Sequence, residues 1–286
     1  MIRWRVLRVS VPDALDDEIA AVLGGGSLGV EVAPTGAGRS ELRVYLGPAD
    51  DAAAWKDRAA RSVAAHGMSA GDAAIRLEPV EDERWAERWQ ETLRPIPVGT
   101  RFVVLPSPSL DPPAGRIPIR LVPGMAFGTG EHETTRLCAA AVEREAAAGS
   151  TWLDLGTGSG LLALIAAHAG ASRVMAVDLD PESAHVAQEA VQANGMGDRV
   201  TVRAGSIDAC GGERFDGIVA NIQASFFLRH AQELAGALRP GGTLIASGFL
   251  LEDLAEIEET LRAAGIVVPD RRSEGAWACL VARLSG

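Results

Sequence analysis

The residues best suited to chemistry lie between Thr151 and Asp180, where a glycine-rich turn separates two apolar segments. The turn contains three alternating glycines, Gly156, Gly158 and Gly160, directly after a short apolar run. Glycines at this spacing let the backbone approach a ligand where any Cβ would clash. The helix expected to follow begins with free backbone N–H groups, which bind polar or anionic ligand atoms. We therefore expect a ligand site at this turn.

Two carboxylates near the turn indicate what the ligand carries. Asp178 ends the next apolar run, where an acid can hold the hydroxyls of a ribose. Asp154 precedes Gly156, and its charge suits a cationic ligand group and would repel a pyrophosphate. The third glycine also comes one residue too early for the dinucleotide pattern G-x-G-x-x-G. These features favour S-adenosylmethionine, a nucleoside with a sulfonium and an amino-acid tail, over a nicotinamide dinucleotide.

The elements around the turn predict a Rossmann-like, doubly wound and mostly parallel sheet. From about residue 100 onwards, short apolar strands alternate with helices. Ligands bind such sheets at the carboxyl ends of the strands. That edge should carry the candidate cofactor-binding residues Asp154, Gly156, Gly158, Asp178, Ser206 and Asn221.

A second glycine-rich segment, Pro-Gly-Met-Ala-Phe-Gly-Thr-Gly at 123–130, comes before the first of these strands. It lacks the Gly-Lys-Ser/Thr of a phosphate loop, and His132-Glu133 lacks the second histidine of a zinc-protease helix. We expect no metal site here. The loop, with Phe127 and Gly128, is expected to close over the cofactor or the reacting group.

The N-terminal region predicts a small α+β domain at 1–80 with the order β-α-β-β-α-β, the ferredoxin-like pattern. RNA-recognition modules share this topology, but they need stacking aromatics and a basic face. Tyr45 is the only aromatic residue on a candidate central strand, and the region is not basic. A protein-docking domain is therefore favoured over an RNA binder, and a purely stabilising domain stays open.

Residues 81–99 are interpreted as a linker between this domain and a catalytic domain at 100–286. The segment begins with a helical pattern that places Trp85 and Trp89 on one face, and it ends in a stretch broken by prolines. A linker that contains a helix should be semi-rigid.

The composition limits the classes of function. A net charge of −11 disfavours a nucleic-acid surface but is compatible with a basic protein partner. The chain has no apolar run long enough to span a membrane and no apolar signal segment at its start. Its three cysteines are far apart, which argues against disulfides or a zinc site. We expect a cytoplasmic protein that is monomeric and has no membrane contact.

Two motifs carry a resemblance to a known family. Pro-Gly-Met-Ala-Phe-Gly-Thr-Gly-x-His-x-Thr-Thr at 123–135 and Ala-Asn-Ile-Gln-Ala at 220–224 resemble the ribosomal protein L11 methyltransferases, which have the class I S-adenosylmethionine-dependent fold. The resemblance implies that Thr135, Gly156, Asp178 and Asn221 contact the cofactor, and that the methyl group meets the amine near Asn221. The family usually has leucine where this chain has Gln223.

By the same resemblance, the reaction is methylation of lysine side chains and the α-amine of the large-subunit ribosomal protein L11. The sulfonium methyl is already activated, so the enzyme mainly has to hold a neutral amine in line with it. Asn221 is the candidate catalytic residue, and no general base is identified. The alternatives are a lysine methyltransferase with another protein substrate and a cofactor-binding regulator without transferase activity. Binding of a nicotinamide cofactor would instead indicate a dehydrogenase.

Overall fold

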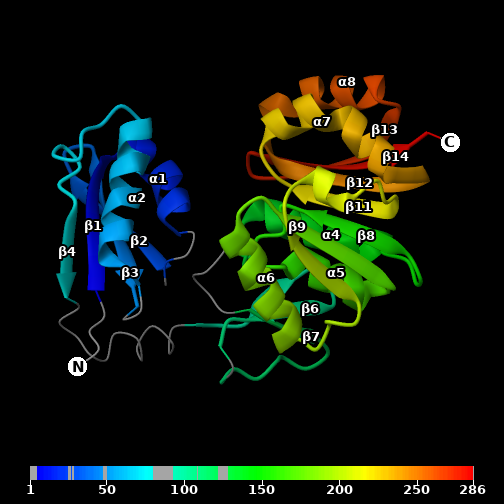
Figure 1. Ribbon diagram of the computed structural model, residues 1–286, viewed down its shortest axis with the longest axis horizontal. Helices are drawn as coiled ribbons and strands as arrows, with labels where there is room; N and C mark the ends of the chain where they lie inside the picture. The colour runs from blue at the N-terminus through cyan, green and yellow to red at the C-terminus, as the bar shows by residue number, and fades with distance from the viewer. Residues whose placement is uncertain are drawn as a thin grey trace. The chain divides into compact units, whose positions relative to one another are not determined.

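The computed structural model describes residues 5–24, 27, 29–47, 50–79, 93–107, 109–121 and 128–285. Contacts divide these residues into two compact units, the first ending at Leu93 and the second starting at Arg94. Each unit has a sheet and a hydrophobic core of its own (Figure 1). Within the described residues, no helix is long and apolar enough to cross a membrane.

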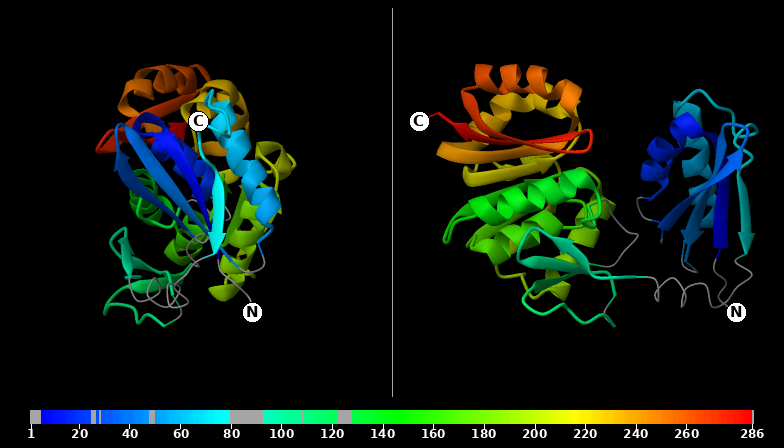
Figure 2. Two further views of the ribbon diagram at one scale, coloured as in Figure 1. Left: turned by 90° about the vertical axis from the view of Figure 1, so that its left-hand side faces the viewer. Right: turned by 180° about the vertical axis from the view of Figure 1, so that it is seen from behind.

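The first unit is an antiparallel sheet with the strand order β2-β3-β1-β4, as the ferredoxin-like pattern predicts. Both helices pack on one face of the sheet (Figure 2), over a core that includes Leu7, Val44 and Trp55. Strand β2 extends to Gly36, into residues for which the sequence predicts a loop. The elements are β1 Arg5–Pro12, α1 Asp16–Gly24, β2 Gly29–Gly36, β3 Arg39–Leu46, α2 Ala52–Ala65 and β4 Arg76–Pro79.

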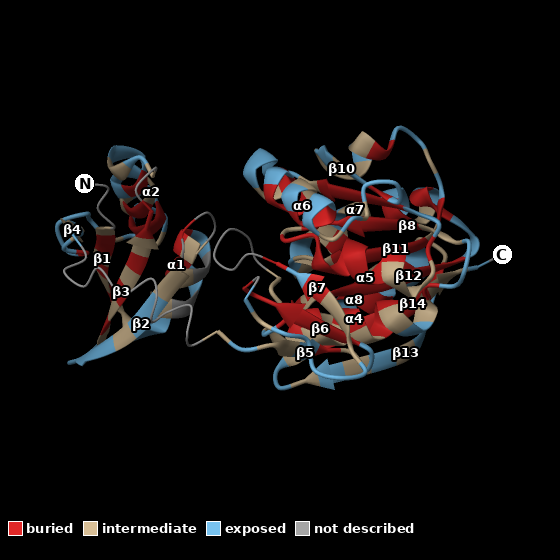
Figure 3. Ribbon diagram, turned by 90° about the horizontal axis from the view of Figure 1, so that it is seen from below, coloured by how far each residue is buried: buried red, intermediate tan, exposed pale blue. Residues whose placement is uncertain are grey.

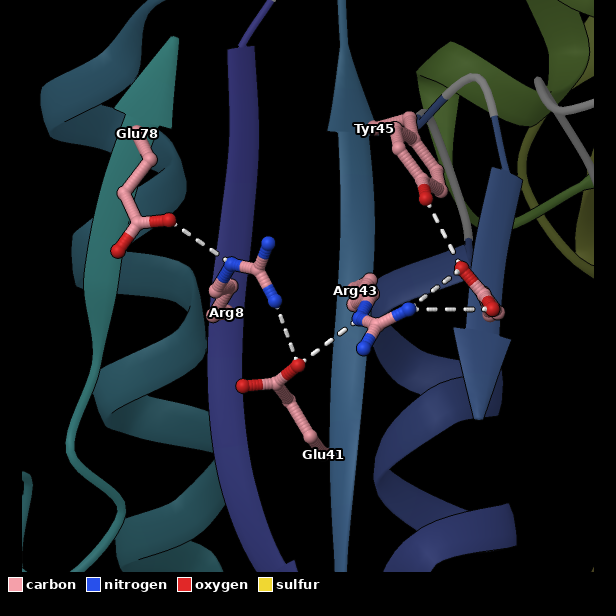
Figure 4. A network of polar contacts seen from close by, with 6 residues as sticks. Arg8, Glu41, Arg43, Tyr45 and Glu78 are labelled. Atoms are coloured by element: carbon pink, nitrogen blue, oxygen red, sulfur yellow. Dashed lines mark hydrogen bonds and ion pairs between the residues drawn. The ribbon is translucent and has the colours of Figure 1, made fainter. Parts of the chain in front are cut away.

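The opposite face of this sheet carries a chain of paired charges (Figure 4). Arg8 contacts Glu41 at 2.6 Å and Glu78 at 2.9 Å, and Arg43 contacts Glu41 at 2.8 Å. The Tyr45 hydroxyl donates to Glu31 at 2.9 Å; burial, followed by this bond, raises the pKa of Tyr45 to about 12. The face presents paired charges in place of the aromatic platform of RNA-recognition modules.

The second unit is a seven-stranded sheet with the order β10-β9-β8-β11-β12-β14-β13. The first five strands in this order are parallel, and β14 and β13 add an antiparallel edge. This confirms the predicted doubly wound, mostly parallel sheet. The strands are β8 Thr151–Leu155, β9 Arg173–Asp178, β10 Val200–Ala204, β11 Phe215–Asn221, β12 Leu238–Leu250, β13 Ile266–Glu274 and β14 Trp277–Leu284.

Helices cover both faces of this sheet (Figure 1). One core cluster joins the sheet to α4, α5 and α6, and the other joins it to α7 and α8. Helix α5, which follows the glycine turn, is buried from Leu161 to Ala167 and lies in the interior of the unit (Figure 3). The helices are α4 Glu133–Glu145, α5 Leu161–Ala169, α6 Pro181–Ala193, α7 Ala224–Ala237 and α8 Leu254–Ala263.

A third, small sheet with the order β5-β6-β7 belongs to the second unit. Its strands are β5 Ile96–Val98, β6 Phe102–Leu105 and β7 Ile117–Arg120, and they share a core cluster with α4 and α5. Strand β5 lies within the range interpreted as a linker, so the last residues of that range are part of the folded second unit. The helical pattern with Trp85 and Trp89 lies outside the described residues.

Candidate functional site

The glycine turn joins β8 to α5 in a backbone conformation that requires glycine. Gly156, Gly158 and Gly160 have φ angles of +73°, +53° and +81°. Residues other than glycine rarely adopt these angles. The Gly156 N–H donates to the Val177 carbonyl at 2.9 Å, so the turn is bound to the end of β9. A Cβ on Gly160 would lie 3.3 Å from the Ala187 Cα, which leaves little room between the turn and α6.

Asp178 ends β9 beside this turn. Its carboxylate accepts hydrogen bonds from the N–H groups of Gly158 at 2.9 Å and Asp180 at 3.0 Å. A carboxylate has about four acceptor positions, so these two bonds orient the group and leave further positions for ligand donors. This is the arrangement that a ribose diol needs.

Asp154 has no exposed surface, and its bonds support the turn from within. One oxygen, Oδ2, accepts from the Thr157 hydroxyl at 2.6 Å and from the Ala163 N–H in the first turn of α5 at 2.9 Å. The other, Oδ1, has no hydrogen-bond partner among the described residues. Burial raises the pKa of Asp154 to about 7, against the opposing effect of the two hydrogen bonds. The sequence predicts that Asp154 faces a cationic ligand group. The structure adds that its carboxylate also holds Thr157 and the start of α5.

Gly128 connects the second glycine-rich segment to the turn. Its carbonyl accepts from the Ser159 hydroxyl at 2.9 Å, and its φ is +97°. Gly128 therefore lies beside the turn, and Ser159, which bonds it, is a residue that the sequence patterns do not single out. Phe127 lies outside the described residues.

Asn221 ends β11 and lies against the first turn of α4. Its Nδ2 donates to the Thr135 hydroxyl at 3.4 Å, a long bond, and Thr135 is buried. Its Oδ1 is shielded from solvent and has no hydrogen-bond partner among the described residues. His132 caps the start of α4, since its Nδ1 accepts from the Thr134 N–H at 3.3 Å. Its ring also contacts Trp277 edge-on.

Ser206 follows β10, and its neighbour Gly205 connects this strand end to β9. The Gly205 N–H donates to the Asp178 carbonyl at 2.7 Å, and the Ser206 N–H donates to Asp208 at 3.3 Å. The described candidates thus lie along one edge of the sheet, at the ends of four adjacent strands and the loops beside them: Gly128, Thr135, Asp154, Gly156, Gly158, Asp178, Ser206 and Asn221.

These residues fit S-adenosylmethionine on structural grounds. Asp154 Oδ1 is a shielded oxygen with no hydrogen-bond donor among the described residues, and such a group costs about 1–3 kcal/mol when it stays unsatisfied. Hydrogen-bond donors and positive charge on a ligand would lower that cost. Gly156 and Gly158 have positive φ angles and carry no side chain, and the Asp178 carboxylate beside them suits a diol.

Comparisons with known proteins identify the family of the chain. The chain matches the family described as "Ribosomal protein L11 methyltransferase (PrmA)" over residues 31–285. A ribosomal protein L11 methyltransferase of Pelotomaculum thermopropionicum is 40% identical over 87% of this chain and 81% of its own length. The corresponding protein of Symbiobacterium thermophilum is 39% identical over 76% and 70%.

A solved structure shows the same similarity in three dimensions. The ribosomal protein L11 methylase of Lactobacillus delbrueckii subsp. bulgaricus is 31% identical, with a TM-score of 0.62 over 68% of this chain and 100% of that one. Both the family match and the relatives cover most of the chain. The chain therefore belongs to the ribosomal protein L11 methyltransferase family.

Proposed function

We propose that this methyltransferase transfers methyl groups from S-adenosylmethionine to amino groups of ribosomal protein L11, namely lysine side chains and the α-amine. The observation that carries the proposal is the position of Asn221 on the strand next to β8 and its glycine turn, with an amide oxygen that has no hydrogen-bond partner in the described part of the chain. The family relatives, which carry this substrate in their names, support the choice of protein.

The residues that would hold the cofactor follow from their contacts. Asp178 would accept the ribose hydroxyls, with Ser206 beside it at the next strand end. Gly156 and Gly158 would admit the methionine portion, and the charge of Asp154 would favour its cationic end. Thr135 and the loop of Phe127 and Gly128 would border the methyl group. When bound, the cofactor supplies a methyl group that its sulfonium has already activated.

Asn221 is proposed to orient the acceptor amine. An amide oxygen accepts an N–H bond from a neutral amine and so directs the nitrogen lone pair. Correct placement of the reacting atoms accounts for a large part of the rate in such reactions. Among the described site residues, Asp154 has a pKa near neutrality, but it is buried against Thr157 and is not proposed as the base.

The test is incubation with labelled S-adenosylmethionine and purified ribosomal protein L11, followed by mass mapping of the product. Label on L11 lysines and the α-amine is the expected result. Label on another ribosomal protein and none on L11 would indicate a different substrate. Cofactor binding without transfer to any protein would indicate a regulator.

Asn221→Ala tests the assignment of the catalytic residue. Turnover of L11 should fall by about 100-fold while the Kd of S-adenosylhomocysteine changes by less than about threefold, because the amide acts on the acceptor. Asn194→Ala is the matched control, since it removes the same kind of amide at the end of α6, where Asn194 bonds the backbone of Arg120 in β7. Unchanged turnover in Asn221→Ala would remove Asn221 from the mechanism.

The N-terminal unit is proposed to dock the protein substrate. Its own core and sheet indicate that it can fold as a unit, and the sheet face opposite its helices carries both acidic and basic side chains. Removal of residues 1–80 should abolish L11 methylation and leave S-adenosylhomocysteine binding intact. Methylation of L11 at the full rate by the shortened chain would refute docking.

A further inference from the structure

Ile222 directly follows Asn221 and is held by the neighbouring strand. Its N–H donates to the Ser247 carbonyl of β12 at 2.9 Å, which continues the pairing of Asn221 with Ser247. The side chain is partly buried against the core cluster under α7 and α8. Ile222 is therefore an ordered residue at the point where the chain leaves the sheet edge.

The backbone of Ile222 lies against Gly248. A Cβ on Gly248 would be 2.6 Å from the Ile222 carbonyl oxygen and 2.7 Å from its nitrogen, closer than real Cβ atoms come. Gly248 has a φ of +92°, and the pairing of β12 with β14 shifts register between Ser247 and Phe249. Such bulges bend a strand and are frequent beside active sites. The bulge at Gly248 thus makes room for the backbone of Ile222.

The side chain of Ile222 reaches the glycine turn on the other side. A Cβ on Gly156 would lie 2.6 Å from Ile222 Cγ2, so the isoleucine occupies the space that a side chain at 156 would need. Ile222 consequently lies between β12 and the residue that opens the cofactor turn.

We propose that Ile222 is a positioning residue that fixes the Asn221 amide relative to the glycine turn. The backbone of Ile222 is held in place by its close contact with Gly248. The proposal rests on the proposed role of Asn221 in orienting the amine. Contact with Gly156 on one side and with Gly248 on the other restrains the residue after Asn221 in two directions. A shift of Ile222 moves the acceptor-orienting amide without removing a group that holds the cofactor.

Gly248→Ala tests the contact between residue 248 and the Ile222 backbone, and Gly265→Ala is its matched control. Gly265 has a similar φ, +82°, but the nearest atom to an added Cβ is Leu284 Cδ1 at 4.0 Å. Both variants place alanine at a positive φ, and only the first brings the new Cβ against Ile222. We expect kcat for L11 to fall by about 100-fold in Gly248→Ala, because small misplacements have large effects on rate. The Kd of S-adenosylhomocysteine should change by less than about threefold. In Gly265→Ala both quantities should stay close to wild type.

Hydrogen exchange of the Ile222 amide gives a readout that is independent of activity. Its bond to Ser247 should open more often in Gly248→Ala than in wild type or Gly265→Ala. Ile222→Ala and Ile222→Val form a second pair for the case in which Gly248→Ala does not fold. The alanine variant loses Cγ2 over Gly156 and should lose kcat, whereas the valine variant keeps a methyl group there and should restore it.

Asn221→Ala in the same assay separates this proposal from the function on which it rests. If Asn221→Ala is inactive while Gly248→Ala and Ile222→Ala turn over at the wild-type rate, Ile222 has no positioning role. If Asn221→Ala is itself fully active, the role of Asn221 fails first. Equal losses of kcat and cofactor affinity in Ile222→Ala would identify it as part of the cofactor site, and that outcome also overturns the proposal.

Discussion

Cofactor binding should depend on pH through Asp154. The carboxyl group is fully buried, and burial raises its pKa to about 7, so the unliganded protein holds it partly protonated at neutral pH. A cationic ligand group at the glycine turn favours the ionised form, since an opposite charge within about 4–6 Å lowers a carboxyl pKa by about 1–3 units. Binding of S-adenosylhomocysteine should therefore release a proton and strengthen as the pH rises.

The size of the effect follows from these values. If the ligand lowers the pKa of Asp154 from about 7 to about 5, the affinity at pH 6 is about tenfold weaker than at pH 8, or ~1.4 kcal/mol. Titration calorimetry at constant ionic strength measures this slope, and two buffers of different ionisation enthalpy report the released proton. Asp154→Asn removes the titrating group and should flatten the profile. A wild-type affinity that does not change with pH, or an equal slope in Asp154→Asn, would refute the reasoning.

The same pKa has a consequence for stability. An acid whose pKa is raised on folding binds more protons in the folded state, so between about pH 4 and pH 7 stability falls as the pH rises. The unliganded wild type should lose thermal stability across this window relative to Asp154→Asn. A saturating ligand should reduce that difference because it stabilises the charged carboxylate.

Two further substitutions test the site and the core. Asp178→Ala should weaken S-adenosylhomocysteine binding by about 10- to 100-fold, because it removes charged acceptors, whereas Asp180→Ala, which only caps α6, should affect stability alone. Isothermal titration of both variants makes this comparison, and equal affinities would contradict the assignment. Gly217→Ala should lower the free energy of unfolding by about 1–3 kcal/mol, because the new Cβ would overlap the indole of Trp152. Urea unfolding measures the free energy of unfolding of this variant and of Gly236→Ala, where an added Cβ meets nothing within 4 Å. Equal free energies of unfolding in the two variants would show that the core adapts to the new Cβ.

The grouping of the candidate residues at one edge of the sheet was predictable because it depends on a general property of parallel sheets. Asp178 and Asn221 each end a strand, Asp154 lies one residue before the end of β8, and the carboxyl ends of parallel strands meet at one edge. The register of β8 with β9 and β11 places these residues on neighbouring strands, as expected. Local patterns were sufficient to identify these strands and their ends, whereas the order of the strands in the sheet is known from the structure.

The small sheet shows where local patterns were insufficient. Ile96-Pro-Val was included in the linker because proline disfavours regular strands, yet β5 pairs with β6 at the edge of its sheet. An edge strand tolerates proline on the side without a partner, and only the tertiary neighbours decide that. Strand β13 similarly continues beyond its apolar start at residues 266–268, because pairing with β14 extends to Glu274.

The supporting residues of the site were missed for a related reason. The clash that keeps residue 248 a glycine depends on the bulge between β12 and β14, whose residues are far apart in sequence from Asn221. Sequence spacing identifies residues that could touch a ligand, but the residues that hold them are selected by packing between strands. Gln223 illustrates the distinction, because its side chain is exposed at the start of α7, whereas Asn221 and Ile222 are partly buried. The departure from the family pattern at 223 therefore lies next to the two residues that the proposed mechanism uses and changes neither of them.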